Sequence, residues 1–275
     1  HDKAVEWIHL ESNLRQAIER QEFILNYQPI IALQTGMLAG MEALVRWHHP
    51  QQGMISPGAF IPVAEASGLI VPLGWTVLVQ ACQQLRTWQQ QYPSLNDLRV
   101  SVNLSAIQFA QPNLAERIQQ MLFETGLKPE NLKLEITESA IMDNAESAAA
   151  ILMELRSTGI QLAIDDFGTG YSSLSYLTQF PVDTLKIDRA FINQLDHNSK
   201  NVGILQAIAT LAHILGMDIV AEGIETEAQL KQLMKFGCEY GQGYLFDRPL
   251  DAQSMDALLA QQYTWQDYIC IPMPV

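Results

Sequence analysis

The sequence has few cysteines and no long hydrophobic run. Its three cysteines, Cys82, Cys238 and Cys270, are odd in number and far apart, which excludes a disulfide framework and a CxxC zinc or redox motif. No apolar stretch reaches the roughly 18 to 20 residues that cross a bilayer, and the N-terminus lacks a signal-peptide pattern. We therefore expect a cytoplasmic domain with reduced thiols and no membrane contact of its own.

Basic residues are also scarce. The chain has 16 Lys and Arg against 30 Asp and Glu, a formal net charge of -14 at pH 7 over 275 residues. Such a charge repels a nucleic-acid backbone, which disfavours long DNA or RNA as a partner. The first residue is His1 rather than Met, which indicates a fragment of a longer polypeptide.

Apolar residues follow an alternating pattern of strands and helices. Helical spacing over residues 1–20 predicts a lead-in helix. Strand-like runs at 23–33 and 37–47 are separated only by Gln34-Thr35-Gly36, so these strands must be antiparallel neighbours. Further strands are predicted at 98–104, 132–137, 160–167, 184–188, 218–224 and 240–246, and helices at 74–91, 114–125, 145–158, 202–215 and 226–236.

Eight strands in about 250 residues predict a modified TIM (β/α)8 barrel whose first strands form a hairpin, with one strand antiparallel. An open doubly wound sheet is the alternative, but its GxGxxG phosphate fingerprint is absent. The expected organisation is the lead-in helix at 1–20, the barrel at 21–255, and a helix end and tail at 256–275 with no assigned role.

Polar residues interrupt the predicted strands, mostly towards their C-terminal ends. A charge near a barrel interior is costly unless it is paired or bound to metal. The spacings 135 − 103 = 32 and 165 − 135 = 30 each match one strand-helix unit. Equivalent positions on successive strands converge at the C-terminal mouth, where barrel active sites lie. The interrupting residues are Glu42, Asn103, Glu135, Asp165, Asp166, Lys186, Asp188, Glu222, Glu225 and Gln242.

The donor types in this set predict a metal site. Carboxylate and amide oxygens suit Mg²⁺ or Mn²⁺, and the absence of His weakens zinc. A single buried acid is about as often part of a structural ion pair as it is a functional residue. Several acids in register on successive strands favour a metal site. The expected oxygen ligands are Glu42, Asn103, Glu135, Asp165 and Asp166. Two ions about 3.5 to 4 Å apart would clamp a phosphodiester and activate water for in-line attack.

Individual roles follow from chemistry and strand alternation. Lys186 either holds the attacking water or neutralises charge on the phosphate, and Glu222 either takes the proton or completes a second metal shell. Glu138 points away from Glu135 and is expected to brace a neighbouring loop. Asp165 and Asp166 are adjacent, so a regular strand cannot aim both inward, but a turn beginning at Asp166 can swing the second one back.

Several short motifs occur in a characteristic order. They are Tyr27-Gln28-Pro29, Glu42-Ala43-Leu44-Val45-Arg46-Trp47, Asn103-Leu104-Ser105, Glu135-Ile136-Thr137-Glu138, Asp165-Asp166-Phe167-Gly168-Thr169-Gly170, Lys186-Ile187-Asp188, Glu222-Gly223-Ile224-Glu225 and Gln242-Gly243-Tyr244. As a set they resemble the EAL-domain cyclic di-GMP phosphodiesterases over roughly residues 10–255. The resemblance implies bacterial second-messenger signalling by hydrolysis of cyclic di-GMP to linear 5′-pGpG, with two Mg²⁺ or Mn²⁺ ions and inhibition by Ca²⁺.

The resemblance also assigns roles by position. It implies that the metal ligands are Glu42, Asn103, Glu135, Asp165, Asp166 and Glu222. The implied catalytic residues are Glu222, Lys186, Glu42 and Asp165. The implied substrate contacts are Gln28, Leu44, Arg46, Asp188 and Gln242. The residues that support or form the loop are Glu138, Gly168, Thr169, Gly170 and Glu225.

Two functions from different classes remain open. The first is an active phosphodiesterase, which the complete ligand set favours, because silent relatives typically lack one or more ligands. The second is a catalytically silent cyclic di-GMP receptor. A barrel metal enzyme acting on another phosphodiester is a more distant alternative. The family resemblance further implies a homodimer and an upstream sensory or GGDEF domain, although this sequence has no GGDEF motif of its own.

Overall fold

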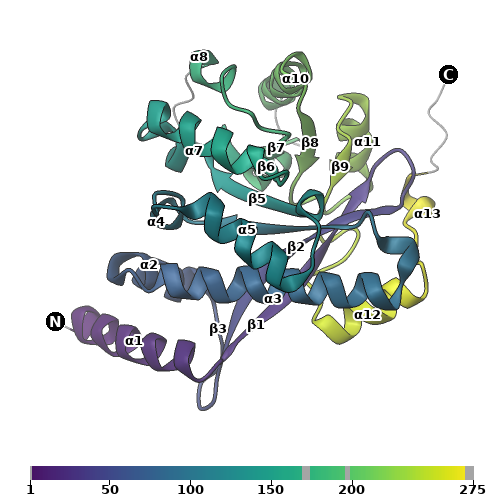
Figure 1. Ribbon diagram of the computed structural model, residues 1–275. Coiled ribbons are helices and arrows are strands. Elements are labelled where there is room, and N and C mark those ends of the chain that lie inside the picture. The colour runs from purple at the N-terminus through teal and green to yellow at the C-terminus, as the bar shows by residue number, and fades with distance from the viewer. Residues whose placement is uncertain (1, 169–173, 196–198, 270–275) are drawn as a thin grey trace.

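In the computed structural model, the described residues are 2–168, 174–195 and 199–269. Eight strands close into a barrel in the order β1-β2-β4-β5-β6-β7-β8-β9, and β3 extends the β2 edge outside it (Figure 1). The strands are β1 (Phe23–Ala32), β2 (Leu38–His49), β3 (Gly53–Ile55), β4 (Arg99–Leu104), β5 (Leu132–Thr137), β6 (Gln161–Phe167), β7 (Thr184–Ile187), β8 (Asp218–Ala221) and β9 (Tyr240–Gly241). The predicted barrel is confirmed.

The opening hairpin makes the barrel irregular. β1 runs antiparallel to both of its neighbours, β2 and β9, whereas the barrel pairings from β2 to β9 are parallel. The physical cause is the tight connection between β1 and β2, in which Gly36 adopts a left-handed conformation with φ 70°. A connection this short cannot return the chain to the start of a parallel strand.

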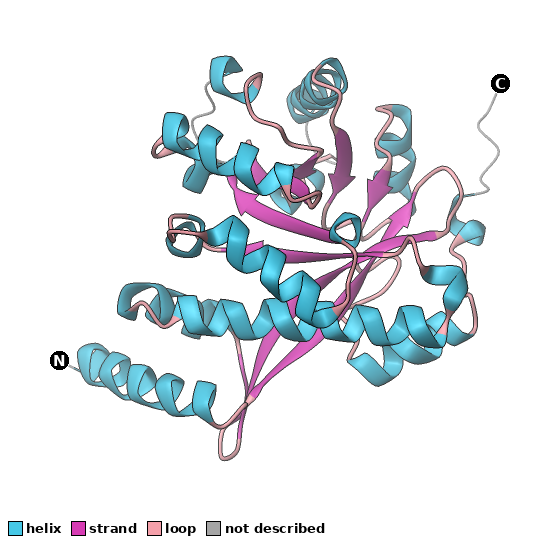
Figure 2. Cartoon of the chain, viewed as in Figure 1, coloured by secondary structure: helices cyan, strands magenta, loops and turns pink. Residues whose placement is uncertain are grey.

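Helices surround the strands (Figure 2). They are α1 (Asp2–Glu19), α2 (Pro57–Ser67), α3 (Ile70–Gln91), α4 (Ala106–Phe109), α5 (Leu114–Thr125), α6 (Glu138–Met142), α7 (Ala145–Ser157), α8 (Leu174–Leu177), α9 (Arg189–Ile192), α10 (Ser199–Ile214), α11 (Glu227–Lys235), α12 (Ala252–Ala260) and α13 (Gln266–Ile269), with 3₁₀ turns η1 (Pro93–Leu95) and η2 (Pro129–Asn131). None of the helices in the described ranges is long and apolar enough to cross a membrane. The pattern missed α2, because apolar residues lie on most of its sides and leave no clear period.

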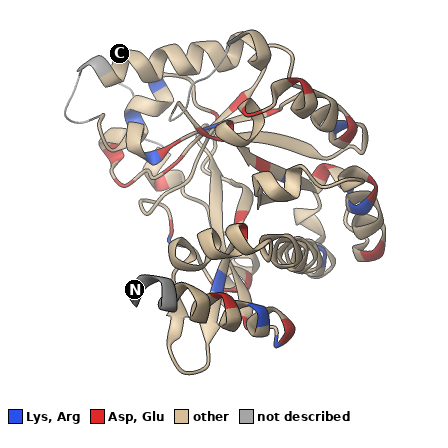
Figure 3. Ribbon diagram, turned by 90° about the vertical axis from the view of Figure 1, so that its left-hand side faces the viewer, with Lys and Arg blue, Asp and Glu red and all other residues tan. Residues whose placement is uncertain are grey.

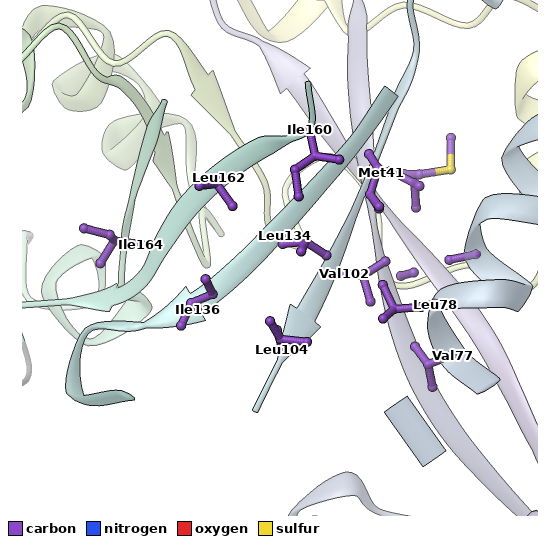
Figure 4. Close-up of a cluster of buried hydrophobic side chains, with 14 of the residues drawn as sticks. Met41, Val77, Leu78, Val102, Leu104, Leu134, Ile136, Ile160, Leu162 and Ile164 are labelled. Carbon is purple, nitrogen blue, oxygen red and sulfur yellow. The ribbon is translucent and has the colours of Figure 1, made fainter. Parts of the chain in front are cut away.

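The main hydrophobic core lies between the barrel and its helices. In β5, Leu134 and Ile136 are fully buried on the outer side, whereas Lys133 and Glu135 alternate with them and face the interior. Figure 4 shows this layer, to which α3 and strands β2, β4, β5 and β6 contribute, with Met41, Val77, Leu78, Val102, Leu104, Leu134, Ile136, Ile160, Leu162 and Ile164 labelled. The barrel interior is polar: Lys133 Nζ donates to Thr184 Oγ1 at 2.8 Å.

Truncating a core side chain should destabilise the barrel strongly. Leu134→Ala removes a fully buried side chain from the outer face of β5, and we expect a loss of about 2 to 5 kcal/mol in the free energy of unfolding. Urea denaturation followed by circular dichroism measures this loss. Met153→Ala on α7, where the side chain is exposed, is the control and should change stability by less than about 0.5 kcal/mol. Equal effects of the two substitutions would contradict the assigned core.

The C-terminal segment packs against the hairpin turn. Trp265 is 1% exposed, and its Nε1 donates to the carbonyl oxygen of Phe246 at 3.2 Å. The Trp265 backbone N–H donates to the carbonyl oxygen of Gly36 at 2.8 Å. A Cβ at Gly36 would lie 2.7 Å from the backbone nitrogen of Gln266, so this contact requires glycine. The segment for which the sequence indicated no role is thus part of the packing around β1 and β2.

Candidate active site

Acidic residues and one lysine meet inside the barrel near the C-terminal ends of its parallel strands. The strand register brings them together, because Asn103 pairs with Glu135 and Thr137 pairs with Asp165 across neighbouring strands. Figure 3 shows acidic segments on the central strands as well as on the outer helices. The convergence that the sequence spacing predicts is therefore present in the structure.

Lys186 lies at the centre of this group. Its side chain is 1% exposed, and its Nζ lies 2.6 Å from Glu222 Oε1, 3.3 Å from Asp165 Oδ1 and 3.5 Å from Glu42 Oε2. It also forms a short hydrogen-bonded ion pair with Glu135 Oε2. Burial alone would lower the pKa of Lys186, but the surrounding carboxylates outweigh burial and hold the pKa well above its usual value. One cation therefore faces four carboxylates.

The carboxylates respond to this imbalance in different directions. Burial raises the pKa of Glu222 to about 8 and that of Glu135 well above its usual value, although Lys186 opposes both shifts. For Glu42, burial is outweighed by Lys186, Gln242 and Asn103, so its pKa is lowered. Repulsion from Asp165 and Glu42 adds to the effect of burial on the pKa of both glutamates. Four carboxyl groups around one lysine form a setting that suits a bound cation.

A break in β6 brings the adjacent aspartates together. The pairing of β6 with β7 shifts register between Ile164 and Phe167, and Asp166 has a left-handed φ of 54°. The Asp166 backbone N–H donates to Asp165 Oδ1 at 2.9 Å. As a result, oxygens of Asp165, Asp166 and Glu222 lie within 4.8 Å of one another. This all-oxygen group fits Mg²⁺ or Mn²⁺, and the predicted return of Asp166 to the site is present in the geometry.

Glu42 is held from two sides. Asn103 Nδ2 donates to Glu42 Oε1 at 2.7 Å, and Gln242 Nε2 donates to Glu42 Oε2 at 2.7 Å. Gln242 Nε2 also lies 3.2 Å from Glu222 Oε1 and so bridges the two glutamates. Because Asn103 donates through its amide nitrogen, its amide oxygen remains available as a metal ligand.

Two adjoining cavities open above these residues. A polar cavity of about 280 Å³ lies over the acids and is lined by Gln28, Glu42, Leu44, Asn103, Asp165, Arg189, Glu222, Gly223, Glu225, Gln242, Gly243 and Tyr244. A more apolar cavity of about 390 Å³ shares Leu44 and Asn103 with it. The second cavity is walled by Arg46 and by α2 and α3, including Pro57, Ile61 and Leu73. Together they form one recess with a polar half and an apolar half.

The predicted substrate contacts fall in different places. Gln28, Leu44 and Gln242 line the polar cavity, and Arg46 lines the apolar one. Asp188 lines neither cavity within the described residues. Asp188 Oδ1 accepts from the Ala190 backbone N–H at 2.7 Å at the start of α9. Burial raises the pKa of Asp166 to about 6, and a hydrogen bond with the Asp188 side chain adds to this shift.

The predicted loop support is partly visible. Glu138 Oε2 accepts from the Gly168 backbone N–H at 2.8 Å, and Glu138 itself is buried. Gly168 has a φ of 92°, a conformation that favours glycine. Thr169 and Gly170 lie outside the described residues. Glu225 lines the polar cavity, while its backbone N–H donates to Gln229 Oε1 at 2.9 Å.

Besides two glycines, the polar cavity is lined by two residues to which sequence reasoning gave no role, Arg189 and Tyr244. Arg189 packs closely on Gly223, where a Cβ would lie only 2.5 Å from the Arg189 Cβ. Tyr244 belongs to the Gln242-Gly243-Tyr244 motif, and Arg189 directly follows the Lys186-Ile187-Asp188 motif, so both lay beside residues that had been given roles.

The fold and the site define a TIM-barrel domain with an acidic candidate active site at its C-terminal mouth. Residues 11–249 match the EAL domain family, so this chain belongs to that family. The match covers every residue of the Lys186 cluster and all of the parallel strands.

Relatives include proteins named as cyclic di-GMP enzymes. The chain is 46% identical over 257 residues to the bifunctional diguanylate cyclase/cyclic di-GMP phosphodiesterase MucR of Pseudomonas aeruginosa, covering 94% of this chain and 37% of MucR. It is 42% identical over 257 residues to the cyclic di-GMP phosphodiesterase NbdA of the same species, covering 94% of this chain and 33% of NbdA. The chain thus spans about a third of the length of these relatives.

A solved structure is similar over nearly the whole domain. The PaMucR phosphodiesterase in complex with c-di-GMP superposes with a TM-score of 0.86 at 46% identity, covering 90% of this chain and 99% of that one. The similarity includes the barrel with its antiparallel β1-β2 hairpin.

Proposed function

We propose that this domain hydrolyses cyclic di-GMP to linear 5′-pGpG with the help of Mg²⁺ or Mn²⁺. The observation that carries the proposal is Lys186 surrounded by four carboxylates at the base of a recess large enough for a nucleotide. The names of MucR and NbdA and the ligand of the PaMucR structure support the choice of substrate.

The chain offers two groups of oxygen ligands for two ions. Asp165, Asp166 and Glu222 form one group, and Glu42, Asn103 and Glu135 are the donors beside it. Divalent ions bound here would supply Lewis-acid stabilisation of the phosphate and a water activated for attack. Ca²⁺ should inhibit, because it prefers longer bonds and more ligands than Mg²⁺.

The protein's own side chains then bind, orient and move protons. Arg46 is suited to a phosphate oxygen, and Lys186 Nζ to the attacking water or a phosphate oxygen. Glu222, with a pKa raised by burial, accepts the proton from water or completes the ligand set. Hydrolysis adds water across one P–O3′ bond, which leaves a 5′-phosphate on one guanosine and a 3′-hydroxyl on the other.

The test is direct. Purified domain is incubated with cyclic di-GMP and Mg²⁺ or Mn²⁺, and the products are separated by chromatography. We expect pGpG, and we expect EDTA or excess Ca²⁺ to prevent its formation. Binding of intact cyclic di-GMP without hydrolysis, in the domain and in a longer chain that includes it, would instead establish the receptor function.

Loss of the loop contact should lower activity without unfolding the domain. Glu138→Ala removes the acceptor of the Gly168 backbone N–H at the end of β6, two residues after Asp166. We expect kcat to fall by about 10² because the aspartates lose their support. Steady-state hydrolysis of cyclic di-GMP measures this effect, with the neighbouring Ser139→Ala as control. An unchanged kcat would show that Glu138 does not act on the site.

The homodimer, the upstream domain and the cytoplasmic location belong to the same proposal. A dimer is supported by the surface of α10, where Ile204 and Ile214 are exposed beside a shallow hollow lined by Gly203 and Ala207. The name of MucR, which pairs a diguanylate cyclase with a phosphodiesterase, supports a GGDEF neighbour in the full-length chain. Sedimentation of the domain at several concentrations tests the dimer.

A further inference from the structure

A second, smaller cavity lies inside the barrel at the N-terminal ends of its parallel strands, at the opposite end from the recess. Its volume is about 20 Å³, enough for one water molecule or a monatomic ion. Three side chains on its wall are hydrogen-bond donors from neighbouring strands, Arg99 and Ser101 of β4 and Lys133 of β5, and most of the remaining wall is apolar. This end of a TIM barrel generally serves stability rather than chemistry.

The donors on this wall have few acceptors in the protein. Lys133 is 8% exposed, and within the described residues its one hydrogen bond is donated to Thr184 Oγ1 at 2.8 Å. Ser101 is buried and Arg99 is half-buried, and neither side chain has a hydrogen bond or an ion pair with any part of the chain that the structure describes. An ammonium group has three donors and a guanidinium group has five, so most of this donor capacity is not used by the protein.

The two cations also lie close enough together to repel each other. A buried charge is costly unless it is paired, and two neighbouring charges of one sign increase that cost. Glu135 is the acid with the largest effect on Lys133, but it forms its ion pair with Lys186 on the other side of the barrel interior. The pairing at the acidic site therefore leaves Arg99 and Lys133 without a carboxylate in direct contact.

The other two acids that act on Lys133 do not supply this contact either. Asp183 uses both of its oxygens: Oδ1 lies 2.7 Å from Arg156 Nη2, and Oδ2 accepts from the Leu162 backbone N–H at 2.9 Å. Asp218 is exposed at the start of β8 and forms no ion pair with a cation of the described residues. Both acids offset the charge of Lys133 only from a distance.

From these observations we propose that the cavity binds one small anion such as chloride. The charges of Arg99 and Lys133 attract it, and the Ser101 hydroxyl donates a hydrogen bond to it. A bound anion would offset the repulsion between the two cations and join β4 to β5 at the closed end of the barrel. This site would be structural, and it does not depend on hydrolysis of cyclic di-GMP.

Thermal unfolding in EDTA at constant ionic strength tests the site in solution. Sodium gluconate is replaced with sodium chloride, because gluconate is too large for a cavity of this volume. We expect Tm to be about 2 to 4 °C higher in chloride, because an anion that binds only the folded state stabilises it. Lys133→Met should abolish this difference, whereas Lys231→Met on α11, where the side chain is exposed, should retain it.

Bromide, which scatters X-rays anomalously, locates the anion directly and does not require a variant that folds. Crystals of the unaltered domain soaked in sodium bromide should show an anomalous peak between Arg99, Ser101 and Lys133. Absence of this peak would overturn the proposal and assign the cavity to water. A peak without a chloride effect on Tm would show binding at crystal concentration only and would also overturn it, as would an equal chloride effect in Lys133→Met.

Discussion

Replacing Lys186 by Met is expected to abolish hydrolysis and to destabilise the metal-free domain by about 3 to 5 kcal/mol. Met is similar in length but carries no charge, so the change leaves four carboxylates at the base of the recess without their common cation. Urea denaturation in EDTA measures the loss of stability. Mg²⁺ or Mn²⁺ should then recover more stability in the variant than in the unaltered domain, because the ion also replaces the missing positive charge.

Lys133 offers a matched control for this experiment. It is the other buried lysine of the barrel interior. Its Nζ donates to Thr184 Oγ1 and forms no ion pair with the four carboxylates, of which only Glu135 acts on it at longer range. Lys133→Met should lower the free energy of unfolding by only about 1 to 3 kcal/mol, because it leaves the Thr184 hydroxyl without its hydrogen-bond donor. Added Mg²⁺ should stabilise this variant no more than it stabilises the unaltered domain. Equal stability of Lys186→Met and the unaltered domain in EDTA would show that Lys186 does not stabilise the four carboxyl groups and would remove the electrostatic basis of the site.

Glu42→Gln should lower kcat by about 10³ while the domain remains folded. The substitution keeps the size of the side chain and removes one negative charge from a group held by Asn103 and Gln242. An amide is a weaker metal ligand than a carboxylate, so we expect higher concentrations of Mg²⁺ to be needed for residual activity. Metal titrations of hydrolysis, with pGpG quantified by chromatography, measure both effects.

The control for Glu42 is an acid away from the site. Glu146 lies exposed in the first turn of α7, and Glu146→Gln removes the same charge from the surface. The kcat of Glu146→Gln should remain within about twofold of the kcat of the unaltered domain. If Glu42→Gln retained full activity at every Mg²⁺ concentration, Glu42 would not be a ligand and the two-ion arrangement would be wrong.

Much of the barrel was predictable because inward-facing and outward-facing side chains alternate regularly along its strands. Residues 132–137 were predicted as a strand with Glu135 facing inward, and β5 has these bounds with Leu134 and Ile136 on the outer face. The segment from Pro57 to Ser67 was not predicted, although α2 walls half of the recess. Its apolar residues lack a clear helical period because the exposed side of the helix also carries apolar residues, Ala59, Pro62 and Ala66.

The sequence by itself determined the barrel, its antiparallel hairpin and the composition of the acidic site. Local properties suffice for these: a three-residue turn excludes a parallel crossover, and equal spacing places polar residues at one end of a barrel. The tertiary structure decided which charged side chains lie next to one another. Three carboxylates from β2, β5 and β6 and a fourth from the residue after β8 surround Lys186 only after the barrel closes. The bulge at Asp166 and the packing of Trp265 on Gly36 likewise depend on contacts between distant segments, which no local pattern encodes.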